Sequence, residues 1–566
     1  MAGIARDHVE RKQGAVLDQG SDESVSAAPA VDRRSRDDDQ FDVVFVGSGI
    51  NGLVGAALLA KQGQRVAVFE RENWLGGAMR TVSSKGGFQT ELMSCFHIQF
   101  LGSPAYRALS ADLERHGLQY ANTDEPFAVV TDEGRSLVVT TDHARNVERL
   151  ERLRPGEGRA WDAAIGALFA HADDLLGVRN LHPLSWDGLR WIWRVYRRRG
   201  GAGTRALFAE LLMSARTWLT DNFEDPLIRD LLAPWALHGA ASPDELGSAI
   251  VIRAVAAFCE AMGQPVPVGG GKAVAAALAA IVEEHGGMCL TGVDVDRVIV
   301  DNDRAVGVAA DDRVFHARRA VACSVTAAQL YDRLLKGVSV PEELRASARR
   351  VRPGPAVFQM AYSLNRPLRW AVDEDLSGVG VINITGGLNA VSRAANEGRR
   401  GLLPAESTIS CGQPMAIDHT RGPEGSSQLW IQVLDLPSVP IGDAAGEIEV
   451  TDGWTVAVRE AFADRIQRRL ARHLPGLEES IIERIAMSPA DLEAANVNLI
   501  GGSSTSGAPD LDQMLVFRPS PYAPAPGTPV KRLYHIGAST HPGGSLAPGS
   551  GFLLAQKLGN RKFRRT

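Results

Sequence analysis

The chain has 566 residues, of which 45% are hydrophobic and 23% are charged, the ordinary composition of a globular protein. A chain of this length can bury a large core, which excludes global disorder and removes the need for a disulfide scaffold. The 61 basic and 67 acidic residues give a net charge of -6. Composition therefore gives no electrostatic reason to expect a nucleic-acid partner.

The five cysteines lie far apart and form no Cys-x-x-Cys pair. This spacing argues against a structural zinc site or a redox motif, and it is typical of proteins in a reducing compartment. The N-terminus lacks the apolar run of a signal peptide, and no stretch reaches the ~18 apolar residues of a transmembrane helix. We therefore expect a cytoplasmic protein, without a metal site, that is at most peripheral to a membrane.

The first predicted elements follow a polar N-terminal segment. Residues 1–40 lack periodicity and end in a run of arginine and aspartate, which predicts a disordered tail. The short, valine-rich run at 41–46 predicts a buried parallel strand. A Gly-x-Gly-x-x-Gly turn at 47–52, a helix over 53–61 and a second strand over 65–70 follow. This order of strand, glycine turn, helix and strand is typical of a dinucleotide-binding α/β unit.

Each glycine of the turn has a separate physical task. Gly47 permits the tight turn, Gly49 lets the backbone approach a pyrophosphate, and Gly52 allows the helix to pack on the strand. The helix that begins here, with Ile50 and Asn51 in the predicted site, directs free N–H groups and the positive end of its dipole at the phosphates.

Glu70 ends the second predicted strand. There its carboxylate can accept hydrogen bonds from ribose hydroxyls, and an acid in place of an arginine disfavours a cofactor with a 2′-phosphate. The predicted cofactor site therefore includes Glu70 and the adjoining Arg71.

The residues after Glu70 indicate which dinucleotide is bound. Gly76-Gly77 and Arg80-Thr81 follow the acid in an order that resembles the FAD-binding segment of the phytoene desaturase and flavin amine oxidase superfamily. In that family the second glycine pair and the nearby arginine reach the flavin side, so the resemblance assigns these residues to the FAD site.

Two later segments resemble the same family. One runs from the glycine turn at 269–271 through a helix to Val295, whose backbone would hold the adenine by this resemblance. The other is the segment 533–544, whose His-Pro-Gly-Gly ending most resembles the phytoene-dehydrogenase-like branch. There the resemblance implies that the phosphates and the isoalloxazine are approached by Gly537, His541, Pro542 and Gly543.

The resemblance implies an α/β fold in which a discontinuous Rossmann-like FAD-binding domain carries an inserted, mixed α+β substrate domain. The predicted FAD-binding domain comprises 41–110, 262–345 and 523–566, and the predicted substrate-binding domain comprises 111–261 and 346–522. FAD would be bound non-covalently, since the C-terminal FAD segment has no cysteine for a flavin linkage.

The sequence contains a single complete dinucleotide fingerprint, which favours a substrate that gives electrons to FAD over an NAD(P)H-driven reductase. The run at 200–203 follows arginines and is interpreted as a loop. We expect a desaturase or dehydrogenase that forms a C=C bond in an apolar isoprenoid, polyene or acyl-type substrate by hydride transfer to flavin N5. The electron acceptor stays open.

Three alternatives stay open as well: amine oxidation, saturation or isomerisation by reduced flavin, and non-redox carriage of a prenyl or lipid group. Flavin amine oxidases commonly place a lysine on a substrate-domain strand near N5. The strand expected over 356–362 has no lysine, which argues against amine oxidation. The apparent completeness of all three FAD segments argues against a pure carrier.

Two histidines are candidate catalytic residues. His541 lies beside the expected isoalloxazine position, where it could orient flavin or substrate, or only fix the turn before Pro542. His97 follows the first FAD segment and could face the substrate cavity, with a packed core histidine as the alternative. His238, on an expected helix of the inserted unit, is interpreted as structural.

Residues 186–199 are a candidate lipid-facing stretch. Aromatic residues alternate there with five arginines, as in an interfacial helix whose rings lie at headgroup depth and whose cations face anionic lipid. The alternative is an amphipathic helix docked on its own domain. The expected partners are thus a hydrophobic or amphipathic small molecule and, as a hypothesis, a membrane surface.

Overall fold

The structure is a computed structural model that describes residues 39–170, 186–372, 374–524 and 526–560. Nearly all of the predicted tail at 1–40 lies outside the described residues. The chain from Phe41 onward forms one compact unit, so the predicted domain boundaries within it stay a prediction.

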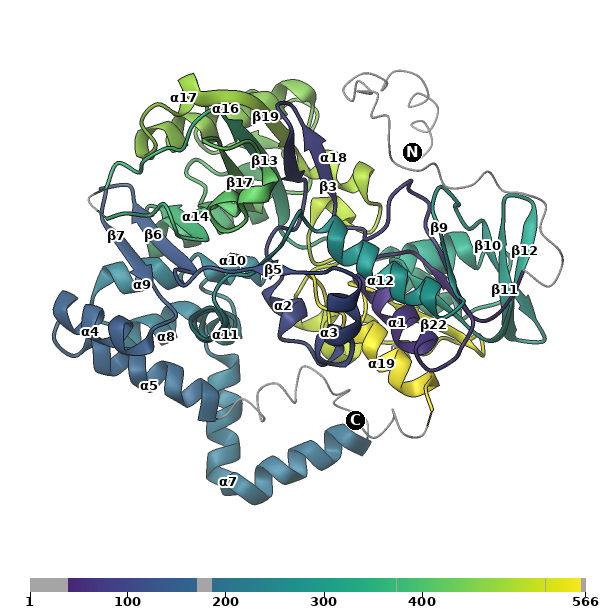
Figure 1. The fold of residues 1–566 in the computed structure, drawn as a ribbon. Helices are drawn as coiled ribbons and strands as arrows, with labels where there is room; N and C mark the ends of the chain where they lie inside the picture. The colour runs from purple at the N-terminus through teal and green to yellow at the C-terminus, as the bar shows by residue number, and fades with distance from the viewer. Residues whose placement is uncertain (1–38, 171–185, 373, 525, 561–566) are drawn as a thin grey trace. The chain divides into compact units, whose positions relative to one another are not determined.

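The first large sheet contains the predicted nucleotide-binding strands (Figure 1). In spatial order its strands are β10 (Arg297–Asp301), β11 (Arg304–Ala310), β12 (Arg313–Ser324), β1 (Gln40–Val46), β2 (Val66–Phe69) and β9 (Met288–Leu290), with β22 (Leu533–Ile536) paired to β12. The pairs β1–β2, β2–β9 and β12–β22 are parallel, and β10, β11 and β12 form an antiparallel meander. Three segments far apart in the sequence therefore share one sheet.

Helix α1 (Ile50–Ala60) joins β1 to β2 and is buried along its whole length. It contacts α12 (Lys272–Glu284) and α19 (Gly549–Leu558), and the three helices lie side by side in Figure 1. The alanines and glycines of α1 allow this close packing, because small side chains let helix and strand backbones approach. The observed start of α1 at Ile50 is three residues before the predicted one.

The second large sheet is mostly antiparallel. In spatial order its strands are β19 (Ile481–Met487), β13 (Ala356–Leu364), β17 (Ser427–Leu436), β16 (Ile409–Gly412), β14 (Val381–Thr385), β6 (Phe127–Thr131) and β7 (Ser136–Val139). Only β14 and β6 pair in parallel among these strands.

Side chains alternate between the two faces of this sheet. One face, which we call the outer face, carries Phe358 and is covered by α16 (Val456–His473), whose Phe462 ring contacts Phe358 edge-on. The other face, which we call the inner face, carries Val381 and Leu434. It packs against α8 (Ala215–Asn222), α9 (Pro226–Leu232), α10 (Trp235–His238) and α11 (Ser248–Met262).

The remaining elements connect these layers. The further helices are α2 (Ile98–Leu101), α3 (Pro104–Arg115), α4 (His143–Leu153), α5 (Glu157–Ala170), α7 (Trp186–Leu212), η1 (Gln329–Leu334), α13 (Glu342–Arg349), α14 (Leu388–Arg399), α15 (Pro414–Ile417), η2 (His419–Arg421), α17 (Leu477–Ser480), α18 (Pro489–Ala495), η3 (Ile500–Gly502), η4 (Leu511–Gln513) and η5 (Leu515–Phe517). The short strands are β3 (Thr81–Ser84), β4 (Phe88–Glu91), β5 (Tyr120–Ala121), β8 (Val266–Pro267), β15 (Leu402–Leu403), β18 (Gly442–Asp443), β20 (Pro519–Ser520) and β21 (Ala523–Pro524).

The glycine run at 200–203, interpreted from the sequence as a loop, lies within α7. Gly200 has a left-handed φ of 69°, and the helix bends there before continuing to Leu212 (Figure 1). The bend needs only one residue outside helical geometry, and glycine adopts that conformation at little cost. Of the helices within the described ranges, none has the length and apolar character needed to cross a bilayer.

Candidate functional site

The predicted phosphate-binding turn lies between β1 and α1. Gly47 has a φ of 94°, and a Cβ at this position would lie 2.8 Å from the carbonyl oxygen of Ser324. A Cβ on Gly52 would lie 2.2 Å from the carbonyl oxygen of Gly47. Gly49, the N-cap residue of α1, provides no side chain to bond the first N–H groups of the helix. The helix N-terminus therefore meets a turn whose three glycines leave the backbone open to close approach, as a bound pyrophosphate requires.

Glu70 lies next to this turn and is 8% exposed. Its Oε2 accepts hydrogen bonds from the N–H of Ser48 at 2.9 Å and from the Ser48 hydroxyl at 2.6 Å. Its Oε1 accepts one from the N–H of Glu72 at 3.1 Å. A carboxylate has more lone pairs than these three donors use, so ribose hydroxyls can still bond to it.

Ser48 is a residue of this site that sequence reasoning missed. Its hydroxyl oxygen also accepts a hydrogen bond from the N–H of Gly76 at 3.1 Å, so it joins the first glycine turn to the second glycine pair. Gly49 and Gly76 form an isolated parallel bridge, and a Cβ on Gly77 would lie 3.3 Å from the Cα of Gly49. The position of Ser48 between the first two glycines was a signal that could have included it.

The C-terminal segment meets the first glycine turn through Asn51. The Asn51 amide donates to the carbonyl of Ala547 at 3.1 Å, and its Oδ1 accepts from the Ser550 hydroxyl at 2.8 Å. Ser550 Oγ in turn accepts from the N–H of Gly537 at 2.9 Å. Asn51 was predicted as a cofactor contact, and the structure shows its amide joining α1 to the C-terminal segment. The predicted phosphate-binding segments around Gly47 and Gly537 thus lie together.

Two other predicted cofactor residues, Val295 and Arg71, differ in burial. The Val295 side chain is buried, and its carbonyl accepts a hydrogen bond from Arg333 at 2.8 Å. Glu70 anchors the chain leading to it, since its carbonyl accepts from the N–H of Val293 at 2.9 Å. Arg71 is exposed and lies 3.5 Å from a Glu72 oxygen. Their contacts with FAD stay predictions.

The predicted flavin-side residues Arg80 and Thr81 are held by neighbouring side chains. The Arg80 guanidinium lies 3.6 Å from the ring centroid of Trp74, and burial lowers its pKa. The Thr81 hydroxyl donates to Glu91 at 3.1 Å and accepts from the N–H of Lys272 at 3.1 Å. These contacts fix the Thr81 side chain, and the contacts of Arg80 and Thr81 with FAD stay predictions.

A buried ion network lies beside Thr81, and sequence reasoning missed it. Arg421 is fully buried and lies 3.1 Å from both Glu91 Oε1 and Asp418 Oδ2. Glu91 also accepts from the N–H of Gly271 at 2.7 Å, and Asp418 from that of Gly269 at 2.9 Å. The network therefore fixes the second predicted FAD segment to the region of β17. Because its members are isolated in sequence, no local motif predicts it.

The two candidate catalytic histidines lie in different surroundings. The His97 ring is completely buried, with its Nδ1 3.4 Å from the hydroxyl oxygen of Tyr120. Burial, with the nearby charge of Arg421, lowers the pKa of His97 to about 3, which favours a packed neutral ring. His541 is 6% exposed and belongs to the turn that follows Gly537. Neither catalytic role is tested by these positions.

The turn with His541 is anchored by Arg518, which is buried. Arg518 donates to the carbonyl of Ala538 at 2.8 Å and to that of Thr505. A Cβ on Gly544 would lie 2.6 Å from the Cα of Thr505, so the two loops are in direct contact. Burial lowers the pKa of Arg518 to about 10, and the guanidinium remains charged at neutral pH.

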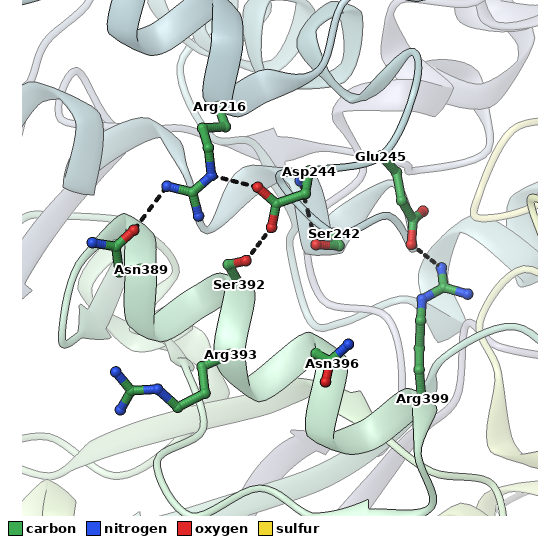
Figure 2. A pocket seen from close by; sticks show the side chains of 9 residues that line it. All are labelled: Arg216, Ser242, Asp244, Glu245, Asn389, Ser392, Arg393, Asn396 and Arg399. Carbon is green, nitrogen blue, oxygen red and sulfur yellow. Dashed lines mark hydrogen bonds and ion pairs between the residues drawn. The ribbon is translucent and has the colours of Figure 1, made fainter.

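A polar cavity of about 520 Å³ lies apart from these residues, between α14 and the turn at 242–245. Figure 2 shows Arg216 paired with Asp244 and Arg399 paired with Glu245. Arg216 also donates to Asn389 at 2.8 Å. These arginines and acids neutralise one another, and no predicted cofactor residue lines the cavity. A second cavity of about 330 Å³ shares Ser242 and Arg399 with it.

The candidate lipid-facing stretch forms the first half of α7. Trp186, Trp193 and Tyr196 are 79%, 59% and 55% exposed. Trp191 and Val195 are buried and pack on Leu207 from the second half of the helix. The helix therefore combines a packed stripe with an exposed aromatic stripe.

Among the described residues, no group of three or more His, Cys, Asp and Glu side chains is arranged to hold a metal ion. The absence of side chains at Gly47 and Gly52, together with the oriented carboxylate of Glu70, instead suits an organic dinucleotide with a pyrophosphate and an unphosphorylated ribose. These geometric features define the class of protein as a dinucleotide-dependent enzyme of the Rossmann type.

A family model described as "Flavin containing amine oxidoreductase" matches residues 50–549. The chain belongs to this family and is an FAD-dependent oxidoreductase. The non-covalent attachment of FAD stays a prediction. The predicted family, fold class and cofactor are confirmed. Gly47, Gly49, Gly52 and Glu70 would hold the pyrophosphate and the ribose.

Individual relatives are distant but extend along nearly the whole chain. Pyridine nucleotide-disulfide oxidoreductase domain-containing protein 2 of Mus musculus is 25% identical over 548 residues, covering 90% of this chain and 92% of the relative. The neurosporene-forming phytoene desaturase of Rhodobacter capsulatus is 22% identical and covers 91% of this chain and 93% of its own. An oxidoreductase structure from Methanosarcina mazei matches with a TM-score of 0.57 at 16% identity, covering 91% of this chain and 99% of that one.

Proposed function

We propose that this FAD-dependent oxidoreductase is a desaturase or dehydrogenase that forms a C=C bond in an apolar isoprenoid, polyene or acyl-type substrate. The observation that carries the proposal is the apolar cluster between the inner face of the second sheet and the helices α8 to α11. Ala78, which follows the predicted flavin-side glycine Gly77, packs against this cluster. An apolar substrate in that region would lie next to the predicted flavin segment.

Two further observations support desaturation over amine oxidation. The Rhodobacter capsulatus relative is a phytoene desaturase that matches along nearly the full chain. Strand β13, where an amine oxidase would carry its lysine, reads Ala-Val-Phe-Gln-Met-Ala-Tyr-Ser-Leu and has no lysine.

The roles of the chain follow from the site. When bound, FAD supplies an acceptor for the hydride of a substrate C–H bond. The apolar cluster would orient the substrate chain and exclude water. The neighbouring carbon loses a proton, for which we propose the imidazole of His541 as acceptor, while the enclosed ring of His97 favours a packing role. Arg518 would keep the His541 turn in place through Ala538 and Thr505.

The test is anaerobic reduction of the bound flavin. The purified protein is expected to be yellow and to release FAD on heating. Polyene hydrocarbons and isoprenoids are expected to bleach the visible flavin absorption, whereas primary amines leave it unchanged. Bleaching by amines alone would establish an amine oxidase instead, and a folded chain without FAD would support a lipid carrier.

We also propose that the first half of α7 contacts anionic membrane surfaces, from which an apolar substrate could be taken up. The support comes from charge and exposure, because Trp186, Trp193 and Tyr196 are exposed on a half-helix, 186–199, that carries five arginines. Such a combination binds headgroups through cations and the interface through aromatic rings.

A further inference from the structure

Polar side chains cross the inner face of the second sheet in a row. Asn383 of β14 is paired in register with Ser410 of β16, Ser410 with Gln432 of β17, and Gln432 with Gln359 of β13. Residues directly opposite each other on neighbouring strands point to the same face. We call these four residues the polar strip. Val381 and Leu434, two residues along from members of the strip, belong to the apolar cluster that surrounds it.

Two amides of the polar strip have unsatisfied groups. Asn383 is completely buried; its Oδ1 accepts from the Ser410 hydroxyl at 2.7 Å, and its Nδ2 has no hydrogen-bond partner within the described part of the chain. Gln359 is 2% exposed, and its Oε1 likewise has no partner among the described residues. Leaving a buried amide unpaired costs free energy, and a ligand that completes its hydrogen bonds recovers that cost.

The centre of the polar strip is accessible. Gln432 is partly exposed, although β17 has a strand on either side and helices cover the inner face. The cavity of about 330 Å³ lies further along β17: its wall includes Leu434, two residues from Gln432, and Leu237 of α10, together with the charged residues Arg352, Arg399, Asp435 and Asp510. Members of the polar strip are not among the lining residues of this cavity, so the partly exposed amide of Gln432 is the point at which a ligand can contact the strip.

His238 of α10 adds a fifth polar group to the polar strip. It follows Leu237 of the cavity wall, and its Nε2 lies 3.3 Å from the Ser410 hydroxyl oxygen. Burial lowers the pKa of His238 to about 4, so the ring is neutral at physiological pH and can donate from one nitrogen and accept at the other. The sequence alone indicated only a structural role for this residue.

The chemistry of these groups selects among substrates. The polar strip and His238 together present three side-chain amides, one hydroxyl and one neutral imidazole. None of these groups carries a charge. Within the polar strip a carboxylate or an ammonium group would lose its hydration without gaining a counter-charge, because Arg352 and Arg399 of the neighbouring cavity are already paired with Asp510 and Glu245. A hydroxyl or a carbonyl oxygen, in contrast, can exchange hydrogen bonds with an amide or an imidazole.

We infer that the polar strip with His238 is the specificity site of this oxidoreductase, and that its substrate is an apolar molecule bearing an uncharged hydroxyl or carbonyl oxygen. The Gln432 amide binds that oxygen, the unpaired Oε1 of Gln359 accepts from it where it is a hydroxyl, and the apolar cluster binds the hydrocarbon part. This inference rests on the proposed function and narrows its substrate class from hydrocarbons to their oxygenated derivatives.

A series of farnesyl compounds that differ only in the head group tests the inference. Binding to the FAD-loaded protein is measured by isothermal titration calorimetry and by the change in the flavin absorption spectrum. Farnesol and farnesal are expected to bind about tenfold more tightly than farnesene, the gain from one or two added hydrogen bonds. Farnesoic acid and farnesylamine are expected to bind no better than farnesene.

The variants Gln432→Met and Gln359→Met keep the side-chain size but remove the amide. Each is expected to reduce the tenfold preference for farnesol to about twofold or less and to leave farnesene binding unchanged. Gln467→Met is the matched control, because Gln467 is a half-buried glutamine of α16, which covers the outer face. FAD content and the thermal midpoint report whether each variant folds.

The inference is overturned if the unaltered protein binds farnesene as tightly as farnesol, or if both variants keep the preference. The wild-type comparison decides the question even where a variant fails to fold. Flavin reduction by farnesene and farnesol at equal rates would leave the proposed function standing without this inference. Selective binding of farnesol with no flavin reduction by any compound would instead contradict the proposed function alone.

Discussion

The carboxylate of Glu70 is held from two sides by the chain itself. Ser48 donates two hydrogen bonds to one oxygen, and the N–H of Glu72 donates to the other. A side chain fixed in this way loses little conformational entropy when a ribose binds to it. At the scale of single residues, the site is therefore preorganised by a serine within the glycine motif.

The variant Glu70→Gln tests this arrangement. The amide nitrogen cannot accept the Ser48 hydrogen bonds, and the charge that strengthens bonds to the ribose hydroxyls is lost. We expect FAD affinity to fall about tenfold to a hundredfold. Equilibrium dialysis against FAD measures the loss. Glu72→Gln, two residues further along and half-buried, is the control and should change affinity little.

The two histidines make a second residue-scale comparison. His541→Gln is expected to slow anaerobic flavin reduction by the substrate about a hundredfold, the usual effect of removing a general base. His97→Gln is expected to leave the rate within about twofold because its ring is enclosed. Stopped-flow absorption measures both rates at equal FAD content. If flavin reduction were slower in His97→Gln and unchanged in His541→Gln, His97 and not His541 would be the proton acceptor.

At the scale of elements, Arg421 joins parts that no local sequence pattern connects. Its guanidinium bonds to Glu91 at the end of β4, to Asp418 before η2, and to the carbonyl of Pro267 in β8. The glycine turn at 269–271 is thereby held against the β3–β4 ribbon. A buried charge set of this kind fixes geometry more than it stabilises the fold.

Removing Arg421 should be costly, because it leaves two buried carboxylates without a counter-charge. We expect Arg421→Met to lower the free energy of unfolding by about 3–5 kcal/mol. Urea denaturation measures the change. Arg152→Met, which breaks an exposed pair with Glu148, is the control and should change stability by less than about 1 kcal/mol. Adding Glu91→Gln to Arg421→Met should recover part of the loss.

The α7 helix permits an element-scale test of membrane contact. Replacing the exposed Trp186 and Trp193 by serine is expected to weaken co-sedimentation with vesicles of anionic phospholipid several-fold, because interfacial rings are lost. The thermal midpoint should not change. Trp191→Ser, at a packed position, should lower the midpoint instead. Equal vesicle binding by the double variant and the parent would contradict membrane contact through this helix.

At the scale of the whole molecule, three histidines in separate regions are buried and neutral. Burial lowers the pKa of His97 to about 3, and those of His238 and His535 to about 4, from an ordinary value of 6.5. The unfolded chain therefore binds protons at mildly acidic pH that the folded chain does not. The stability these residues contribute is complete above about pH 6.5 and is lost as the pH falls toward 4.

The free energy of unfolding should accordingly fall as the pH is lowered through this window, by about 1.4 kcal/mol per pH unit for each histidine. Carboxylates contribute as well at the acid end, so a variant isolates the effect. In the His97→Gln variant, the free energy of unfolding should fall less steeply with decreasing pH than in the parent, by about 1.4 kcal/mol per pH unit. Urea denaturation at a series of pH values measures both slopes. Parallel slopes would mean that His97 titrates normally in the folded chain.

Local chemistry made part of this molecule predictable. The turn at Gly47, the helix after it and the carboxylate of Glu70 depend on neighbouring residues, and the structure places them together. The use of Asn51 as an anchor and the Arg421 network depend instead on pairings across hundreds of residues, and the polar strip depends on the pairing of four separate strands. Strand register, which aligns Gln432 with Gln359, cannot be read from either strand alone.

The bonding of Asn51 to Ser550 has a consequence for biosynthesis. The first glycine turn is among the earliest structured parts to leave the ribosome, but β22 and the start of α19, which complete its surroundings, are translated almost 500 residues later, as the sequence separation of 499 between these two side chains shows. The surroundings of the first glycine turn are therefore complete only after translation has passed Ser550, and we expect FAD to bind after that point.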